Sequence, residues 1–267
     1  MSDGYTTVRV DREGAVDWLT LNRPERLNTL NGAMVRELWT YFSRLEANFS
    51  RRIVVLRGAG AHFCAGMDLK AQSDPGERLP SGQATAGPEA SLSGVVRLMR
   101  RCPQPIISLV HGSACGGGFA LALASDIRIA GETARMNDAF VKLGLSGCEL
   151  GLSFFLPRIV GLSIAAELMM TGAFIDAERA KAVGLVSSVT TDAGMADAAR
   201  GLVAQMLRTS PLGLRQTKAT LNQALRLSDL DAVINLEEHA QITCMQSGDF
   251  HEATRAFLEK REPRYAT

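Results

Sequence analysis

The feature that most constrains this chain is a run of three glycines, Gly116 to Gly118, within the segment HGSACGGGFALALASD at residues 111–126. An apolar stretch, PIISLV, precedes the run, and a stretch of small residues follows it. Consecutive glycines are entropically costly and suit places where the backbone must approach another group closely. At a strand-to-helix junction they also leave free N–H groups at the positive end of a helix. The triplet therefore indicates either a tight turn that packs a helix on a strand or a site for developing negative charge.

The order of the apolar runs predicts an α/β fold made of repeated strand, strand, helix units. Strands are expected at residues 7–10, 15–21, 53–56, 106–110, 126–130 and 183–189. Helices are expected at residues 34–45, 92–101, 161–170 and 175–182, and Asn31 can cap the first of them. The units repeat in pattern only, because no sequence repeat accompanies them.

From about residue 193 the pattern becomes helical, with helices expected at residues 194–209, 212–225, 230–244 and 251–260. We therefore expect a core at residues 1–192 and a C-terminal helical region at residues 193–267. A helical region of this size buries little by itself, so it must pack on its own core or on a neighbouring subunit.

Composition excludes several classes of protein. The net charge of +1 and the pI of about 7.7 give no bulk attraction to nucleic acid or to a membrane surface. No apolar run reaches the ~18 residues that span a bilayer, and the N-terminus lacks the pattern of a signal peptide. The five cysteines and four histidines show no metal-ligand spacing. A cytoplasmic, metal-free protein is expected, with a mobile loop at residues 73–88.

Five sequence blocks resemble the enoyl-CoA hydratase/isomerase (crotonase) superfamily: NRPERLN, AHFCAGMDL, HGSACGGGFALALASD, GLSGCELGLSFFLPRIVG and FLEKREP. They follow the family's order and spacing over nearly the whole chain. The resemblance implies a crotonase-like spiral of ββα units with a C-terminal helical trimerisation region, and homotrimers that commonly pair into hexamers. It also implies an acyl-CoA thioester substrate, with coenzyme A as part of the substrate and no separate cofactor.

The resemblance further implies an oxyanion hole made by the backbone N–H groups of Met67 and Gly117. Backbone donors cannot titrate or change rotamer, and removing one such donor typically costs about 3 kcal/mol of transition-state stabilisation. Coenzyme A is placed against residues of three blocks. These are Ala65, Gly66, Asp68 and Leu69 of AGMDL, Arg26 and Leu27 of NRPERLN, and Phe257 and Lys260 of FLEKREP.

Two positions depart from the pattern of the family's hydratases. Those enzymes carry glutamates where this chain has Ala120 and Phe140, so the two-glutamate mechanism of hydration cannot run. Glu149, eight residues before Pro157, matches an acidic position of the superfamily's isomerases. A single carboxylate can take a proton from one carbon and return it to another, so Glu149 is the candidate acid and base.

Apolar neighbours on both sides of Glu149 predict a partly desolvated carboxylate with a raised pKa. Alternatively, Glu149 stabilises the dipole of the helix that follows it. Asp138 is a second candidate, because on an extended stretch its side chain would face the same way as that of Phe140. It could equally be a turn residue or an N-cap.

Other polar residues in these blocks are interpreted as structural. Cys64, Cys115 and Cys148 are expected to be packing residues, since no histidine is paired with them. His111 and Asp126 are expected to serve turns or packing.

The leading hypothesis is an enoyl-CoA double-bond isomerase in which Met67 and Gly117 hold the enolate and Glu149 moves the proton. One alternative is a 2-enoyl-CoA hydratase of fatty-acid oxidation. The other is a non-catalytic subunit that binds acyl-CoA, which the missing glutamates would explain.

Overall fold

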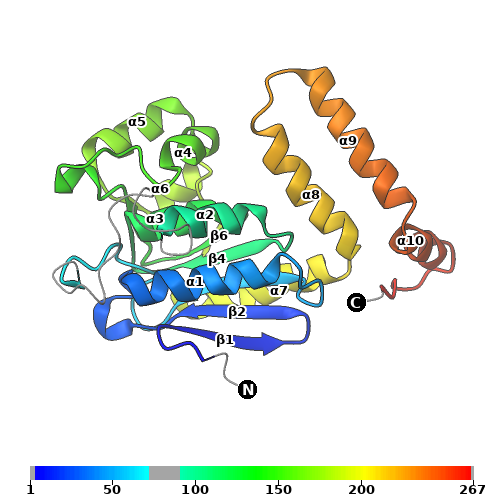
Figure 1. The fold of residues 1–267 in the computed structure, drawn as a ribbon, viewed down its shortest axis with the longest axis horizontal. Coiled ribbons are helices and arrows are strands. Elements are labelled where there is room, and N and C mark those ends of the chain that lie inside the picture. The colour runs from blue at the N-terminus through cyan, green and yellow to red at the C-terminus, as the bar shows by residue number, and fades with distance from the viewer. Residues whose placement is uncertain (1–3, 72–90, 266–267) are drawn as a thin grey trace.

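The computed structural model describes residues 4–71 and 91–265, so the loop predicted at residues 73–88 lies outside the described residues. Two β-sheets organise the chain (Figure 1). The six-stranded sheet has the order β1-β2-β3-β4-β6-β9, formed by Val8–Glu13, Val16–Leu21, Ile53–Gly58, Ile106–Val110, Ile127–Gly131 and Ser188–Thr190. The smaller sheet has the order β5-β7-β8, formed by Ser113–Cys115, Arg135–Asn137 and Ile175–Asp176.

From β4 to β7, consecutive strands alternate between the two sheets, as a spiral of ββα units requires. β4 and β6 lie side by side in the larger sheet, whereas β5 and β7, which follow them in the chain, pair in the smaller sheet. β1 and β2 form an antiparallel hairpin, and β2, β3, β4, β6 and β9 run parallel. β4 is buried along its whole length, as expected for a parallel strand covered on both faces. The predicted α/β spiral is therefore confirmed.

Helices cover the sheets between the strands (Figure 1). The core helices are α1 (Gly32–Leu45), α2 (Leu92–Arg101), α3 (Gly117–Ala124), α4 (Leu152–Val160), α5 (Leu162–Thr171) and α6 (Ala177–Ala182). Short 3-10 helices span Pro24–Arg26, Val141–Leu143 and Asp192–Gly194. The predicted cap of α1 is confirmed, because the Met34 N–H donates to the Asn31 side chain at 3.0 Å.

The strand predicted at residues 183–189 is wrong over most of its length, since β9 begins at Ser188. Gly184 has a φ of +77°, and the Leu185 N–H donates to the carbonyl of Ala180 at 2.8 Å. These residues therefore close the C-terminal end of α6. The apolar run is buried as a helix end, where its side chains need no strand partner.

The C-terminal helices are α7 (Met195–Leu207), α8 (Pro211–Ala224), α9 (Leu230–Met245) and α10 (Gly248–Leu258). α7 packs on the larger sheet, where Met195, Ala199 and Val203 share a core cluster with Trp18 and Ile53. α8, α9 and α10 extend away from the sheets (Figure 1). α9 has no buried residue. No described helix is long and apolar enough to cross a membrane.

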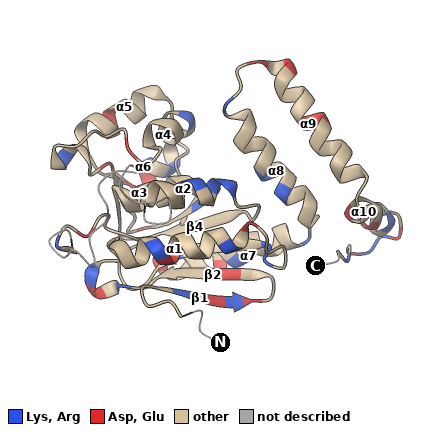
Figure 2. Ribbon diagram, in the orientation of Figure 1, with Lys and Arg blue, Asp and Glu red and all other residues tan. Residues whose placement is uncertain are grey.

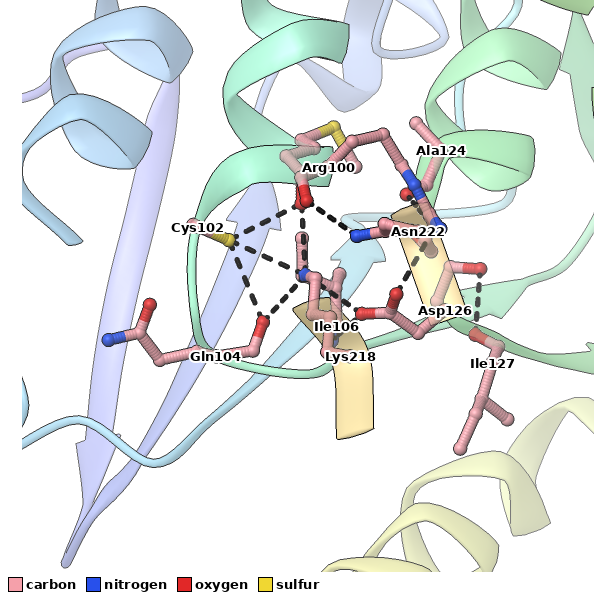
Figure 3. A network of polar contacts seen from close by, with 12 residues as sticks. Arg100, Cys102, Gln104, Ile106, Ala124, Asp126, Ile127, Lys218 and Asn222 are labelled. Carbon is pink, nitrogen blue, oxygen red and sulfur yellow. Dashed lines mark hydrogen bonds and ion pairs between the residues drawn. The ribbon is translucent and has the colours of Figure 1, made fainter. Parts of the chain in front are cut away.

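A buried polar network fastens α8 to the core (Figure 3). The ammonium group of Lys218, 5% exposed, lies 2.9 Å from a carboxylate oxygen of Asp126. It also donates to the carbonyls of Met99, at 2.9 Å, and Gln104, at 2.8 Å. Arg100 pairs with the other Asp126 oxygen at 3.1 Å. Asp126 and its partners thus join α2, α8 and the start of β6.

Candidate active site

Two loops that follow β3 and β4 are joined by a short ladder of backbone hydrogen bonds. The Phe63 N–H donates to the carbonyl of His111 at 2.8 Å, and the Cys64 N–H donates to that of Ser113 at 3.0 Å. The Cys115 N–H returns a bond to the carbonyl of Cys64 at 3.0 Å. This pairing brings the AGMDL block beside the glycine triplet, although about 50 residues separate them in the sequence.

The Met67 N–H faces away from its own pairing partner. The Leu30 N–H donates to the carbonyl of Gly66 at 2.8 Å, and the Asp68 N–H donates to the carbonyl of Leu30 at 3.0 Å. In a parallel bridge of this kind, the central residue, here Met67, points its own N–H to the other side. Neither Met67 nor Gly117 donates its N–H to another described residue. Both amides are therefore available to an acceptor.

The three glycines meet three different requirements. Gly116 has a φ of +48°, a conformation that L side chains rarely adopt. A Cβ on Gly118 would lie 2.1 Å from the carbonyl oxygen of Cys64, so α3 packs directly on the neighbouring loop. A Cβ on Gly117 would meet Leu30 and Leu92 side chains at 2.8 Å. The interpretation as a tight packing turn is confirmed by this geometry.

The amide of Gly117 lies at the N-terminal end of α3, which is buried throughout and carries no charged residue (Figure 2). A Cβ built on Gly66 would lie 3.9 Å from the Gly117 nitrogen, so the two segments are in contact. Unpaired N–H groups at a helix N-terminus attract negative charge. The site can therefore stabilise an oxygen that becomes negative.

The two positions that differ from hydratases are apolar in their surroundings as well as in their side chains. Ala120 lies within α3 and is fully buried. The ring of Phe140 lies 3.6 Å from the position that a Cβ would take on Gly116. The structure places no carboxylate at either point.

Glu149 lies on the loop before α4 and is exposed, so the expected desolvation is wrong for the isolated chain. The physical reason is a left-handed turn, since Leu150 has a φ of +51° and Gly151 one of +86°. This turn carries Glu149 outward, whereas the Leu150 side chain lies 3.9 Å from the Cβ position of Gly117. Glu149 and Leu150 line a groove of about 910 Å³ between α2, α4 and α8. Leu150, the residue after Glu149, thus lies against the glycine turn, whereas Glu149 itself is exposed.

Asp138 does not share the orientation of Phe140, because β7 ends at Asn137 and the chain turns there. The Phe140 N–H donates to one Asp138 oxygen at 3.2 Å. The other oxygen is buried without a hydrogen-bond partner among the described residues, beneath Gly147. Burial raises the pKa of Asp138 to about 6, partly opposed by the Phe140 hydrogen bond. Asp138 thus acts as a turn residue, which was one of the alternatives to a catalytic role that the sequence left open.

The predicted coenzyme A residues divide into two groups, the first around the NRPERLN loop. Arg26 and Leu27 are exposed, and the carbonyl of Leu27 accepts the Ala65 N–H at 3.0 Å. Leu69 is exposed, and Gly66 is buried against Cys115. The Leu27–Ala65 hydrogen bond thus brings the NRPERLN loop against the segment that contains Met67.

The side chain of Asp68 has internal partners. Burial alone would raise its pKa, but hydrogen bonds from Ala71 and Arg23 hold that pKa below its usual value. The Arg23 guanidinium lies 3.0 Å from the Asp68 carboxylate. Sequence reasoning missed Arg23 and also Asn28, which is fully buried and donates to the carbonyls of Ala59 and His62 at 2.8 Å. The cluster of asparagines after β2 was the available signal, because Asn tolerates the left-handed φ of +52° found at Asn28.

The second group lies far from the first. Phe257 belongs to α10 and is 83% exposed, and Lys260 follows the helix with a φ of +55°. α10 lies at the opposite side of the molecule from α3 (Figure 1). A single chain therefore does not bring Phe257 or Lys260 to Met67 and Gly117.

The cysteines near the site are suited to packing. Burial raises the pKa of Cys64 to about 12 and that of Cys115 to about 11, so both thiols stay protonated at neutral pH. Cys148 is exposed. Among residues 4–71 and 91–265, no group of three or more His, Cys, Asp or Glu side chains could hold a metal ion.

This fold defines a class of protein. The family model for enoyl-CoA hydratase/isomerase matches residues 11–267. The chain belongs to the enoyl-CoA hydratase/isomerase family.

Named relatives and solved structures agree with that assignment. The chain is 38% identical to the probable enoyl-CoA hydratase EchA12 of Mycobacterium tuberculosis, covering 92% of this chain and 87% of that protein. It is 36% identical to the 1,2-epoxyphenylacetyl-CoA isomerase of Escherichia coli, covering 95% of each. A crystal structure of enoyl-CoA hydratase from Bacillus anthracis matches with a TM-score of 0.90 and 30% identity, covering 97% of this chain and 99% of that one. The relatives therefore carry the names of more than one reaction.

Proposed function

We propose that this protein moves the double bond of an enoyl-CoA thioester, with Glu149 as the acid and base. The observation that carries the proposal is the distribution of carboxylates. The hydratase positions hold the buried apolar residues Ala120 and Phe140, whereas a carboxylate is present at Glu149, whose neighbour Leu150 lies 3.9 Å from the Cβ position of Gly117. One carboxylate is sufficient for isomerisation, because the proton removed from one carbon is returned to another.

In the proposed reaction, the thioester carbonyl oxygen accepts the N–H groups of Met67 and Gly117. Glu149 removes a proton from the acyl chain, and the electron pair delocalises onto the carbonyl oxygen. The two amides and the N-terminal end of α3 stabilise that negative charge. Glu149 then returns the proton to the other end of the allylic system, which leaves an isomer of the same mass.

Hydration of a 2-enoyl-CoA is the second candidate, because EchA12 and the Bacillus anthracis protein are named as hydratases. Glu149 would then have to activate water and also protonate the α-carbon. A non-catalytic acyl-CoA-binding subunit is the third candidate, and it would keep the amides but not need Glu149.

We further infer that the protein assembles as a homotrimer or hexamer in the cytoplasm. Leu230, Ile242 and Met245 of α9 are each more than half exposed, and a helix with no buried residue needs another surface to cover it. The free cysteines suit a reducing compartment. Assembly would also be the means of bringing Phe257 and Lys260 to a substrate.

The test compares wild type, Glu149→Gln and the matched control Glu132→Gln, which changes an exposed glutamate outside the site. Each is incubated with 2-enoyl-, 3-enoyl- and dienoyl-CoA, and products are followed by absorbance and mass. We expect an isobaric product from wild type and from the control, and loss of turnover in Glu149→Gln with coenzyme A binding intact. A product heavier by one water would identify a hydratase, and full activity of Glu149→Gln would overturn the assignment of the base.

A further inference from the structure

The helix behind the glycine turn, α3, is short and completely buried. It spans Gly117–Ala124, and all 8 of its residues are buried. At 1.5 Å per residue, its two ends lie only ~12 Å apart. A helix has a negative C-terminal end as well as a positive N-terminal end. In so short a helix, the negative end opposes the attraction of the Gly117 amide for an anion unless another group neutralises it.

Two arginines from other elements cover the negative end of α3. Arg128, in β6, donates its Nη1–H groups to the carbonyls of Ala122, at 3.3 Å, and Ser125, at 2.6 Å. Arg100, in α2, donates to the carbonyl of Ala124 at 3.2 Å (Figure 3). α3 has no charged residue of its own. The positive charge at its C-terminal end is therefore supplied from outside the helix, to carbonyls at and just beyond its last turn.

The neighbouring helix α5 ends in a simpler way. Its last turn has no basic residue, and it is closed by Gly172, whose N–H donates to the carbonyl of Leu168 at 2.9 Å. Gly172 adopts a φ of +59°, as is usual for a glycine that ends a helix. A backbone cap is thus sufficient to end a helix in this fold, so the two arginines at α3 call for a further explanation.

Arg128 differs from the other cations here because its hydrogen bonds among the described residues all go to carbonyls. Its Nε–H donates to the carbonyl of Leu185 at 2.8 Å. Asp126 pairs instead with Arg100, at 3.1 Å, and with Lys218, at 2.9 Å. Burial lowers the pKa of Arg128 to about 10, partly opposed by Asp126, so the guanidinium stays positive at neutral pH. Three cations and one carboxylate thus leave a net positive charge around the C-terminal end of α3.

We propose that Arg128 is a positioning residue that acts through α3 on the negative charge developing at the Met67 and Gly117 amides. The inference rests on the proposed function, because it needs a thioester oxygen at those amides. Arg128 offsets the negative end of α3 with a positive charge ~12 Å from the Gly117 amide. At an effective dielectric constant of about 20, a unit charge at that distance changes an ionisation constant by about tenfold. The burial of α3 limits screening of this effect by salt.

The test measures the enolate itself. Acetoacetyl-CoA ionises to an enolate that absorbs in the near ultraviolet, so its apparent pKa on the full-length protein is obtained from absorbance against pH. We expect Arg128→Gln to raise that pKa by about one unit, and Arg128→Lys, which keeps the charge, to restore most of the wild-type value. Asp126→Asn removes a negative charge from the same end of α3 and should lower the pKa. Mere damage to the helix would instead raise the pKa in both Arg128→Gln and Asp126→Asn.

Arg52→Gln is the matched control. Arg52 donates to the carbonyls of Leu207, at 2.9 Å, and Thr209, at 2.6 Å, beyond the end of α7. Burial lowers its pKa too, but α7 contributes no residue to the candidate site. This variant should keep the enolate pKa within about 0.3 unit of the wild-type value.

The outcomes separate this inference from the function on which it rests. The measurement needs no turnover, so it does not depend on which residue is the base. An enolate pKa in Arg128→Gln equal to that of wild type, with both below the pKa of free acetoacetyl-CoA, would overturn the inference alone. A wild-type pKa equal to that of the free ligand would overturn the oxyanion site and the inference with it. If Arg128→Gln does not fold, the direction of the Asp126→Asn shift decides, and a raised pKa there would refute the role of Arg128.

Discussion

Replacing Lys218 with methionine tests whether the polar network in Figure 3 fastens α8 to the core. Methionine keeps most of the apolar stem and removes the ammonium group, so little volume is lost. Breaking a buried ion pair by deleting one partner costs about 3–5 kcal/mol. Asp126 keeps Arg100 at 3.1 Å and the Ile106 N–H at 2.8 Å, which favours the lower end of that range.

Two further acceptors lose their donor in this variant. The carbonyls of Met99 and Gln104 each accept from Lys218, and an unmade buried hydrogen bond costs about 1 kcal/mol or more. Relaxation of the α8 end lets water replace part of this loss, so we expect Lys218→Met to lower the free energy of unfolding by about 3–4 kcal/mol.

Urea unfolding followed by circular dichroism at several protein concentrations measures this difference and detects any linked change of assembly. The control is Lys142→Met, since Lys142 is exposed; it should change the free energy by less than about 0.5 kcal/mol. A loss below about 1 kcal/mol in Lys218→Met, similar to the control, would refute the view that this ion pair holds the helical region in place.

Two other perturbations test the site directly. Gly118→Ala should destabilise the protein by at least about 3 kcal/mol, because its Cβ would lie 2.1 Å from the Cys64 carbonyl oxygen. The control is Gly201→Ala, which has nothing near its Cβ and should stabilise α7 by about 0.5–1 kcal/mol. Equal unfolding free energies for the two variants would contradict this. Asp138 has a pKa raised from 3.8 to about 6 in the folded chain, so the folded state holds its proton more tightly than the unfolded state. Its stabilising contribution is present below about pH 4 and is lost as the pH rises through 6, by up to about 3 kcal/mol. Thermal melts of wild type and Asp138→Asn should therefore diverge between pH 4 and 7, and parallel curves would exclude this titration.

Long periodic elements were predictable from the sequence, because their burial pattern is local. The apolar spacing of α1 and its Asn31 cap, and the continuous apolar run of β4, both follow from residues close together in the chain. The strands of the smaller sheet were missed, since two or three residues cannot show a period. Their pairing depends on distant segments.

The candidate site could be located only through motif position. Nothing local to Met67 or Gly117 shows that their segments touch, because the ladder joining them is long-range. The exposure of Glu149 was not predictable either. Leu150 adopts a positive φ that its residue type disfavours, so Leu150 packs toward the glycine turn while Glu149 is exposed.

The ladder between residues 62–66 and 111–115 also bears on how such a chain can change over time. Its rungs are main-chain hydrogen bonds. The side chains that support them, Asn28 at the His62 carbonyl and His62 at the Ser113 N–H, lie outside positions 120 and 140. Ala120 and Phe140 stand beside this unit without disturbing it. Under the proposed function, the side chains that move protons can therefore differ from one loop to another, while the backbone that would hold the thioester oxygen keeps its geometry.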